Sequence, residues 1–242
     1  MRVLVTGTGR GGTTLLREVV IGLNVARFYC GVYSKEEDRA FFNYNELPEG
    51  YMTKLTLPNS SNLGRDTCCE GLSNYMEKYN DLHLVFSIRH PVDTCMSKIV
   101  RGQKHSDGGH KWGEEISADG TIETAIKAVI SMHDIYKTVK KRYPTRVLAV
   151  KMEELILNPR EAIGRIATFF HCGVTQRSLT FYMYNSNPYQ FRDYGTELNT
   201  NQINLYEKWQ TAYDGFFSQR EKDIERAKHE LRSEIKDFGY NI

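Results

Sequence analysis

The sequence predicts an α/β fold in which a mainly parallel sheet lies between two layers of helices. Two observations predict it. Short apolar segments of strand length alternate along the chain with longer segments whose apolar residues recur at helical spacing. Apolar residues make up 40% of the 242 residues and aromatic residues 12%, which is enough for a sizeable buried core. No repeat, linker or low-complexity tract divides the chain, so we expect a single domain spanning residues 1–242.

The first expected strand, residues 2–6, is an apolar run that ends at Gly7, and the helix expected after it covers residues 13–24. Later strands are expected at residues 51–57, which stop at Pro58, and at residues 83–88 and 146–151. Helical spacing predicts further helices at residues 121–142, 159–171 and 202–236, the last with a break near residues 214–215. Residues 101–120, rich in Gly and His, are expected to form a loop.

Charge and composition exclude several classes of protein. Lys and Arg total 32 against 30 Asp and Glu, a formal net charge of +2, which argues against a general nucleic-acid binder. No apolar stretch approaches the roughly 18 residues that span a bilayer, and the N-terminus has no secretory pattern. The five cysteines are interpreted as mostly reduced thiols, so the predicted location is cytoplasmic. A redox role for the adjacent Cys68 and Cys69 is the alternative.

A glycine-rich loop follows the first strand, with the sequence Gly7-Thr8-Gly9-Arg10-Gly11-Gly12-Thr13-Thr14. Glycines let backbone N–H groups turn toward an anion, and the N-terminus of the next helix adds a favourable dipole. A nucleoside-triphosphate P-loop would carry lysine where Thr13 stands. A dinucleotide-binding pattern can be forced on Gly7, Gly9 and Gly12, but the acidic residue expected about 20 positions later is not apparent. An ordinary tight turn is the other alternative.

A second motif follows the strand at residues 83–88. Arg89-His90-Pro91 ends the strand and opens a helix, because Pro91 suits a first helical turn. Ser97 comes eight residues after Arg89, two turns into this helix. An Arg at the carboxyl end of a strand and a Ser on the next helix can converge on one phosphate at the edge where open α/β sheets bind ligands. A structural ion pair is the alternative for Arg89.

Together these residues resemble the P-loop sulfotransferases. Arg10-Gly11-Gly12-Thr13-Thr14 matches that family's 5′-phosphosulfate loop, and Arg89, Pro91 and Ser97 match its 3′-phosphate motif, with His90 in place of an acidic or amide residue. The segment VLAVKMEELILNP resembles a further family strand, with Met152 where Tyr is usual, and the ending LRSEIKDFGY resembles the closing helix and tail. The resemblance implies a three-layer P-loop NTPase-like fold. It also implies 3′-phosphoadenosine 5′-phosphosulfate (PAPS) as donor, the bisphosphate PAP as product, and no metal.

The resemblance also assigns expected roles. Arg10 is the candidate catalytic cation, which stabilises charge on the leaving phosphate. The 5′-phosphosulfate is expected to lie against Gly9, Arg10, Gly11, Gly12, Thr13 and Thr14. Arg89 and Ser97 are expected to hold the 3′-phosphate, and Arg192 is expected to contact the 3′-phosphate and adenine from a C-terminal loop.

Lys54 is a second catalytic candidate, because Lys54-Leu55-Thr56-Leu57-Pro58 resembles the family's K-T-H-L-P strand, whose lysine contacts the transferring group. Thr56 stands where that strand carries its histidine base, and threonine cannot act as a base near neutral pH. The base is therefore open. His133, near the place of an acceptor-site histidine in related enzymes, is the catalytic candidate. Weaker alternatives are His105, His110, Glu46 and Asp66.

The expected activity is in-line transfer of a sulfuryl group from PAPS to a hydroxyl or amine of a small-molecule, carbohydrate or lipid acceptor. The aromatic residues of segment 181–194 line the acceptor pocket in this interpretation, or belong to the core. One alternative is a nucleotide or small-metabolite kinase with an atypical P-loop, and another is a nucleotide-binding regulatory domain. Thr13 in the lysine position and the Arg89–Ser97 pair favour the sulfotransferase.

Overall fold

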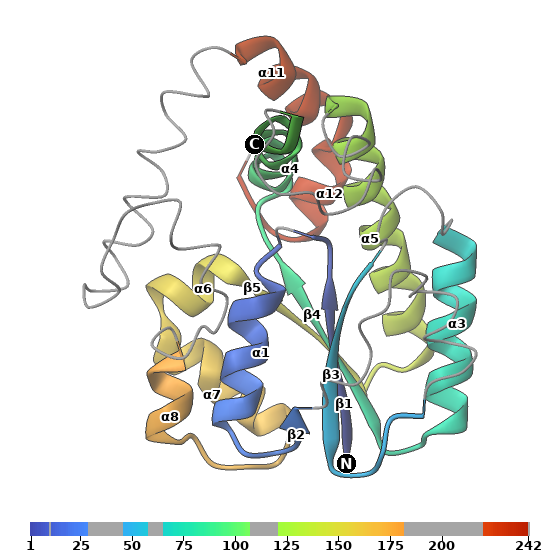
Figure 1. The fold of residues 1–242 in the computed structure, drawn as a ribbon, viewed down its shortest axis with the longest axis vertical. Helices are drawn as coiled ribbons and strands as arrows, with labels where there is room; N and C mark the ends of the chain where they lie inside the picture. The colour runs from blue at the N-terminus through green and yellow to red at the C-terminus, as the bar shows by residue number, and fades with distance from the viewer. Residues whose placement is uncertain (10, 29–45, 58–64, 107–120, 182–219, 242) are drawn as a thin grey trace.

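A computed structural model describes residues 1–9, 11–28, 46–57, 65–106, 121–181 and 220–241 (Figure 1). Within these residues a five-stranded sheet has the order β2-β3-β1-β4-β5, and every neighbouring pair is parallel. The expected α/β fold with a parallel central sheet is confirmed. The strands are β1 Arg2–Gly7, β2 Arg27–Phe28, β3 Tyr51–Thr56, β4 Leu82–Ile88 and β5 Val147–Lys151.

The register of the strands brings four carboxyl ends to one edge of the sheet. Gly7, the last residue of β1, lies opposite Thr56 of β3 and Ser87 of β4. Ile88 of β4 lies opposite Lys151, the last residue of β5. Ligands of open α/β sheets bind outside this edge. The glycine loop after β1 and the Arg89 turn after β4 are therefore neighbours.

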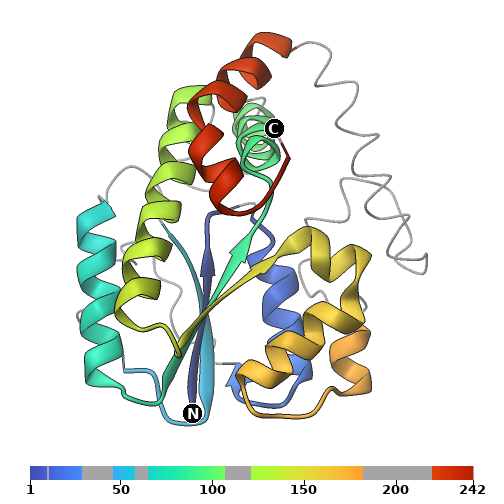
Figure 2. The same ribbon diagram turned by 180° about the vertical axis from the view of Figure 1, so that it is seen from behind.

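Two layers of helices cover the faces of the sheet (Figures 1 and 2). Because side chains alternate along a strand, Val3 and Val5 of β1 pack toward one layer and Leu4 packs toward the other. The Val3 face is covered by α1 Thr13–Gly22, α6 Met152–Leu157, α7 Pro159–Phe169 and α8 Gln176–Leu179. The Leu4 face is covered by α3 Arg65–Lys78 and α5 Ile122–Arg142.

A third apolar cluster lies beyond the carboxyl edge of the strands. It joins the first turns of α4 Pro91–Ser106 and of α5 to the C-terminal helices α11 Glu221–Glu230 and α12 Arg232–Asp237. Cys95, Met96, Ile99, Leu231 and Ile235 are buried in it. The C-terminal helices therefore support α4 at the end of the molecule that carries the predicted site (Figure 2).

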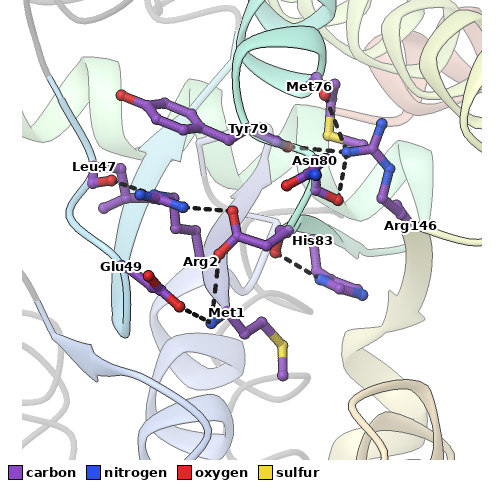
Figure 3. A network of polar contacts seen from close by, with 10 residues as sticks. Met1, Arg2, Leu47, Glu49, Met76, Tyr79, Asn80, His83 and Arg146 are labelled. Atoms are coloured by element: carbon purple, nitrogen blue, oxygen red, sulfur yellow. Dashed lines mark hydrogen bonds and ion pairs between the residues drawn. The ribbon is translucent and has the colours of Figure 1, made fainter.

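The opposite edge of the sheet is fixed by a polar network (Figure 3). Arg2 pairs with Asp81 at 2.5 Å, and its Nε donates to the Leu47 carbonyl at 2.6 Å. The Arg146 guanidinium donates to three carbonyls at the end of α3, those of Met76, Tyr79 and Asn80. These bonds tie β1, β3 and β4 together at their amino ends, away from the glycine loop.

Several expected boundaries differ from the structure. The short strand β2 and helix α3 were not predicted, although Cys68, Leu72, Tyr75 and Met76 of α3 are buried at helical spacing. Helix α4 continues to Ser106, so the loop expected from residue 101 is wrong for its first six residues. The helical prediction for 202–236 is confirmed from residue 221 on, with a break at Leu231, and its earlier part lies outside the described residues. No helix in the described ranges is long and apolar enough to cross a bilayer.

Candidate active site

The glycine loop is shaped by contacts with neighbouring strands. Gly7 has φ +143°, and a Cβ there would lie 2.4 Å from the Ser87 carbonyl oxygen, so only glycine fits. The Ser87 hydroxyl donates to the Gly11 carbonyl at 2.6 Å, and the Leu57 amide donates to the Gly7 carbonyl at 2.9 Å. Strands β3 and β4 thus hold both ends of the loop.

Gly12 ends the loop and is the N-cap of α1. Its φ is +87°, and a Cβ there would lie 2.8 Å from Cγ and Sδ of Met152. Gly12 has no side chain with which to cap the first turn of α1, so the amides of this turn face the loop without a side-chain acceptor. A helix N-terminus of this kind favours a bound anion.

Lys54 reaches the loop from β3. Its Nζ donates a hydrogen bond of 3.2 Å to Oγ1 of Thr14 in the first turn of α1. Thr13 and Thr14 are both buried. Strand β3 and helix α1 therefore meet at this point. The structure brings together three predicted site residues there: Lys54, Thr13 and Thr14.

Arg89 and Ser97 stand on either side of the turn between β4 and α4. Both are buried, and Arg89 is only 4% exposed. The first turn of α4 is closed by the Thr94 amide, which donates to the His90 carbonyl at 2.9 Å. The expected strand-to-helix turn is confirmed, and it places Arg89 beside the strand that carries the glycine loop.

Glu153 links this turn to the C-terminal segment. Its Oε1 accepts from the His90 amide at 2.9 Å, and its Oε2 accepts from the Tyr240 hydroxyl at 2.8 Å. Burial raises the pKa of Tyr240 far above the usual value, and the Glu153 carboxylate raises it further. Lys151 lies over the Tyr240 ring, 4.5 Å from its centroid. Glu153 and Tyr240 were not among the predicted site residues, although both lie in segments that carry the family resemblance.

Lys98 was also not among the predicted site residues. It follows Ser97 on α4 and is 4% exposed. Its Nζ lies 3.8 Å from the position that a Cβ would take at Gly9 of the glycine loop. The only sequence signal for it is its place immediately after a predicted phosphate-binding serine.

The structure places His133, the candidate base, on α5. It lies in the middle of α5 and is 2% exposed, with Nε2 3.3 Å from Oδ2 of Asp237 and Nδ1 3.8 Å from Oε1 of Glu234. The Phe238 ring packs edge-on against the imidazole at 4.9 Å. Burial lowers the pKa of His133, and Lys137 lowers it further against the opposing effect of Glu234. These contacts join α5 to α12 and to the residue that follows it.

The weaker base candidates occupy different places. Glu46 pairs with Lys78 at the end of α3, level with the amino ends of the strands, so it is remote from the glycine loop. Asp66 is exposed in the first turn of α3, on the side of the carboxyl edge. His105 lies in the last turn of α4, and its side chain is outside the described part of the chain. Arg10, His110 and Arg192, with most of segment 181–194, lie outside the described residues.

The donor set suits a ligand with more than one anionic group. Backbone amides of the glycine loop, Lys54, Lys98 and Arg89 all lie at one edge of the sheet, and two of these cations are buried. Cations in such a place bind phosphate or sulfate oxygens. Among the residues that the structure describes, no group of three or more His, Cys, Asp or Glu side chains could hold a metal ion.

Solved structures with the same fold are sulfotransferase domains and related proteins. The sulfotransferase domain of a Synechococcus olefin synthase is 13% identical, with a TM-score of 0.52 over 79% of this chain and 82% of that chain. Retinol dehydratase in complex with retinol and PAP is 16% identical, with a TM-score of 0.54 over 100% and 83%. A mouse sulfotransferase in complex with PAP is 17% identical, with a TM-score of 0.51 over 76% and 64%.

Identity this low shows a common fold, and the family follows from the sequence itself. Comparison with curated proteins finds no match. The family model described as the sulfotransferase domain matches residues 1–201, which include the glycine loop, the Arg89 turn and Glu153. The chain therefore belongs to the sulfotransferase domain family.

Proposed function

We propose that this protein transfers a sulfuryl group from PAPS to a hydroxyl or amine of an acceptor and releases PAP. The observation that carries the proposal is the pair of anion-binding elements on adjacent strands. A glycine loop with no room for side chains at Gly7 and Gly12 follows β1, and a buried arginine follows β4. Two such elements match a nucleotide that carries anionic groups at both its 5′ and 3′ positions.

Each element has a distinct task in the proposed reaction. The amides at the start of α1, with Thr13 and Thr14, hold the 5′ group, and Lys54 is held at the same point by its bond to Thr14. Arg89 and Ser97 hold the 3′-phosphate, which fixes the orientation of the donor. Arg10 and Arg192 are assigned to the sulfate and to the 3′-phosphate with adenine, as the family resemblance implies.

Charge stabilisation is the main catalytic contribution that we assign to the chain. PAPS supplies the sulfuryl group and a phosphate leaving group: the sulfur–oxygen bond to phosphate breaks as a bond to the acceptor oxygen or nitrogen forms. Lys54, Arg10 and the loop amides stabilise the negative charge that grows on the leaving oxygen, as fixed donors do in phosphoryl transfer. The acceptor proton passes to a base or to solvent.

Two described residues, His133 and Asp66, are candidates for the base that accepts the acceptor proton. His133 can take this role only if an acceptor reaches its imidazole, and Glu234 and Asp237 cover that ring. Asp66, exposed on the side of the carboxyl edge, is the described alternative. Substituting His133 and Asp66 separately distinguishes them. Loss of the true base lowers turnover and leaves PAP affinity unchanged.

A ligand-binding experiment separates the proposal from the kinase alternative. The thermal midpoint of the protein is measured with PAP and with ATP plus Mg²⁺. A ligand that binds only the folded state raises the thermal midpoint. At a concentration 100 times its dissociation constant, it adds about 2.7 kcal/mol to the free energy of unfolding. We expect PAP to stabilise the protein. Stabilisation by ATP–Mg²⁺ without any by PAP would overturn the proposal.

The acceptor must offer a hydroxyl or an amine to the sulfuryl group. One of the structural neighbours is a complex with retinol, which is a small apolar alcohol. We propose a small molecule, carbohydrate or lipid with a hydroxyl or amine, and transfer of labelled sulfate from PAPS to phenols, sugars, amines and lipids tests the classes side by side. Four described cysteines are free thiols, which supports a location in a reducing, cytoplasmic compartment.

A further inference from the structure

We propose that Lys98 is a further donor-binding residue, which contacts the 5′-phosphosulfate at the glycine loop from α4. The proposal rests on the proposed function and deepens it, since it adds a cation that neither the loop sequence nor the 3′-phosphate motif contains. Its basis is the position, the burial and the charge of Lys98.

The position of Lys98 is set by helix α4. Ser97 and Lys98 are consecutive, and consecutive residues on an α-helix point about 100° apart. Ser97 is assigned to the 3′-phosphate. Lys98 instead brings its ammonium group to Gly9, 3.8 Å from where a Cβ would stand. A side chain longer than alanine at this position would compete with the ammonium for the same space, so the glycine leaves the face of the loop open to Lys98.

Lys98 is 4% exposed, so its ammonium group lies in a part of the site that holds little water. A cation in such a place attracts an anion more strongly than a cation in open water does. On its own helix the neighbouring side chains of Cys95, Met96 and Ile99 belong to an apolar cluster. A cation kept between an apolar cluster and a glycine loop is well placed for an anion that arrives as a ligand.

The chemistry of the loop gives this cation a role. Thr13 stands where a nucleoside-triphosphate P-loop carries its lysine, so α1 supplies no ammonium group to the bound phosphate. Lys98 supplies one from a different helix. Lysine is a compact point charge with three donors, which suits contact with several oxygens of one anionic group. With Lys54 on β3, it would place two ammonium groups at the 5′ end of the donor.

The experiment compares two variants with three ligands by isothermal titration calorimetry. Lys98→Met removes the charge at nearly constant length, and Lys98→Arg keeps it. The ligands are PAP, adenosine 5′-monophosphate and adenosine 3′-monophosphate. We expect Lys98→Met to weaken PAP and the 5′-monophosphate by about 10- to 100-fold, the usual range for one charge-assisted hydrogen bond. Binding of the 3′-monophosphate should be unchanged, and Lys98→Arg should stay close to the unmodified protein.

Arg89→Ala is the matched control, because Arg89 is assigned to the other phosphate. It should weaken PAP and the 3′-monophosphate and spare the 5′-monophosphate. A structural role for Lys98 predicts a different pattern: Lys98→Met would unfold at lower temperature without ligand and bind PAP as tightly as before, which would overturn the inference. If Lys98→Met does not fold, Lys98→Gln provides the same comparison. Failure of the unmodified protein to bind PAP would overturn the proposed function itself.

Discussion

The Nζ atom of Lys54 lies 3.2 Å from Oγ1 of Thr14, and this hydrogen bond joins β3 to the first turn of α1 beside the glycine loop. The bond holds the lysine against the point where the 5′ group of the donor is proposed to lie. It also places the ammonium group beside one of the two buried threonines that open α1.

Lys54→Met should lower turnover more than it lowers PAP affinity. The charge on the leaving phosphate grows only in the transition state, so a group that stabilises it acts mainly on kcat. We expect a loss of about 100-fold in kcat, comparable to the loss of one fixed donor to a developing charge. Steady-state kinetics with labelled PAPS measures this change. If PAP affinity fell about 100-fold while kcat stayed unchanged, Lys54 would be assigned to ground-state binding instead.

The Lys54–Thr14 bond itself can be measured by a double-mutant cycle. Lys54→Met, Thr14→Val and the double variant are compared by urea unfolding without ligand. We expect a coupling free energy of about 0.5–1.5 kcal/mol, the range of one hydrogen bond. Additive effects would show that the bond contributes nothing to the folded protein in the absence of a ligand.

Gly12→Ala should destabilise the protein by about 2 kcal/mol or more. The positive φ of Gly12 disfavours any side chain, and its Cβ would lie 2.8 Å from Met152. Adding Met152→Ala should relieve the clash and leave the backbone strain, so the double variant should be less destabilised than the sum of the single variants. Urea unfolding of the three variants checks this. Gly164→Ala is the control, because a Cβ there meets no atom within 4 Å.

Tyr240→Phe should loosen the Arg89 turn without touching the ligand. It removes the hydroxyl that donates to Glu153, at a cost of about 1 kcal/mol in unfolding free energy, and we expect PAP affinity to fall several-fold through the Glu153–His90 contact. The pKa of Tyr240 is raised above its ordinary value of 10, so the stability that this residue contributes is present below about pH 10 and is lost above it. Tyr240→Phe should flatten that alkaline loss. If the variant lost stability at high pH as the unmodified protein does, the alkaline loss would not come from Tyr240.

His133→Gln should change the acid side of the stability profile. Because burial lowers the pKa of His133 below its ordinary value of 6.5, the folded protein favours the neutral ring, while the unfolded chain takes up a proton. The contribution of His133 is therefore fully present above about pH 6.5 and is lost as the pH falls below it. We expect the variant to lose less stability than the unmodified protein between pH 6.5 and 5. A collapse of kcat with an unaltered stability profile would instead support His133 as the base.

The sequence was sufficient for four of the five described strands and for the two turns proposed to bind anions. Apolar runs that end at Gly7, Pro58 and Arg89 indicate strands of a parallel sheet. The glycine loop is recognised from its own sequence, because its glycines are close together between a strand and a helix. Helix α3 was missed because polar and small residues obscure its spacing, and α4 was ended too early at a stretch that begins with Arg101 and Gly102.

The contacts that shape the site could not be read in the same way. Lys98 reaches Gly9 from α4, and Glu153 joins His90 to Tyr240, residues 63 positions before it and 87 positions after it. Such pairings depend on how helices pack over the sheet, and no local pattern encodes that. The same holds for His133 on α5, whose contacts with Glu234 and Asp237 come from a helix about 100 residues later in the chain.

The steric demands on Gly7 and Gly12 also bear on the order in which the protein can fold. Gly7 is fitted to the carbonyl of Ser87, and Gly12 is fitted to Met152, so the loop depends on partners 80 and 140 residues later in the chain. Contacts of such high sequence separation slow folding, because a long segment must be ordered before they form. The loop, although among the first residues of the described chain, is thus expected to take its shape late. A donor nucleotide would then stabilise the native state and not the folding transition state. We therefore expect it to slow unfolding and to leave the folding rate unchanged.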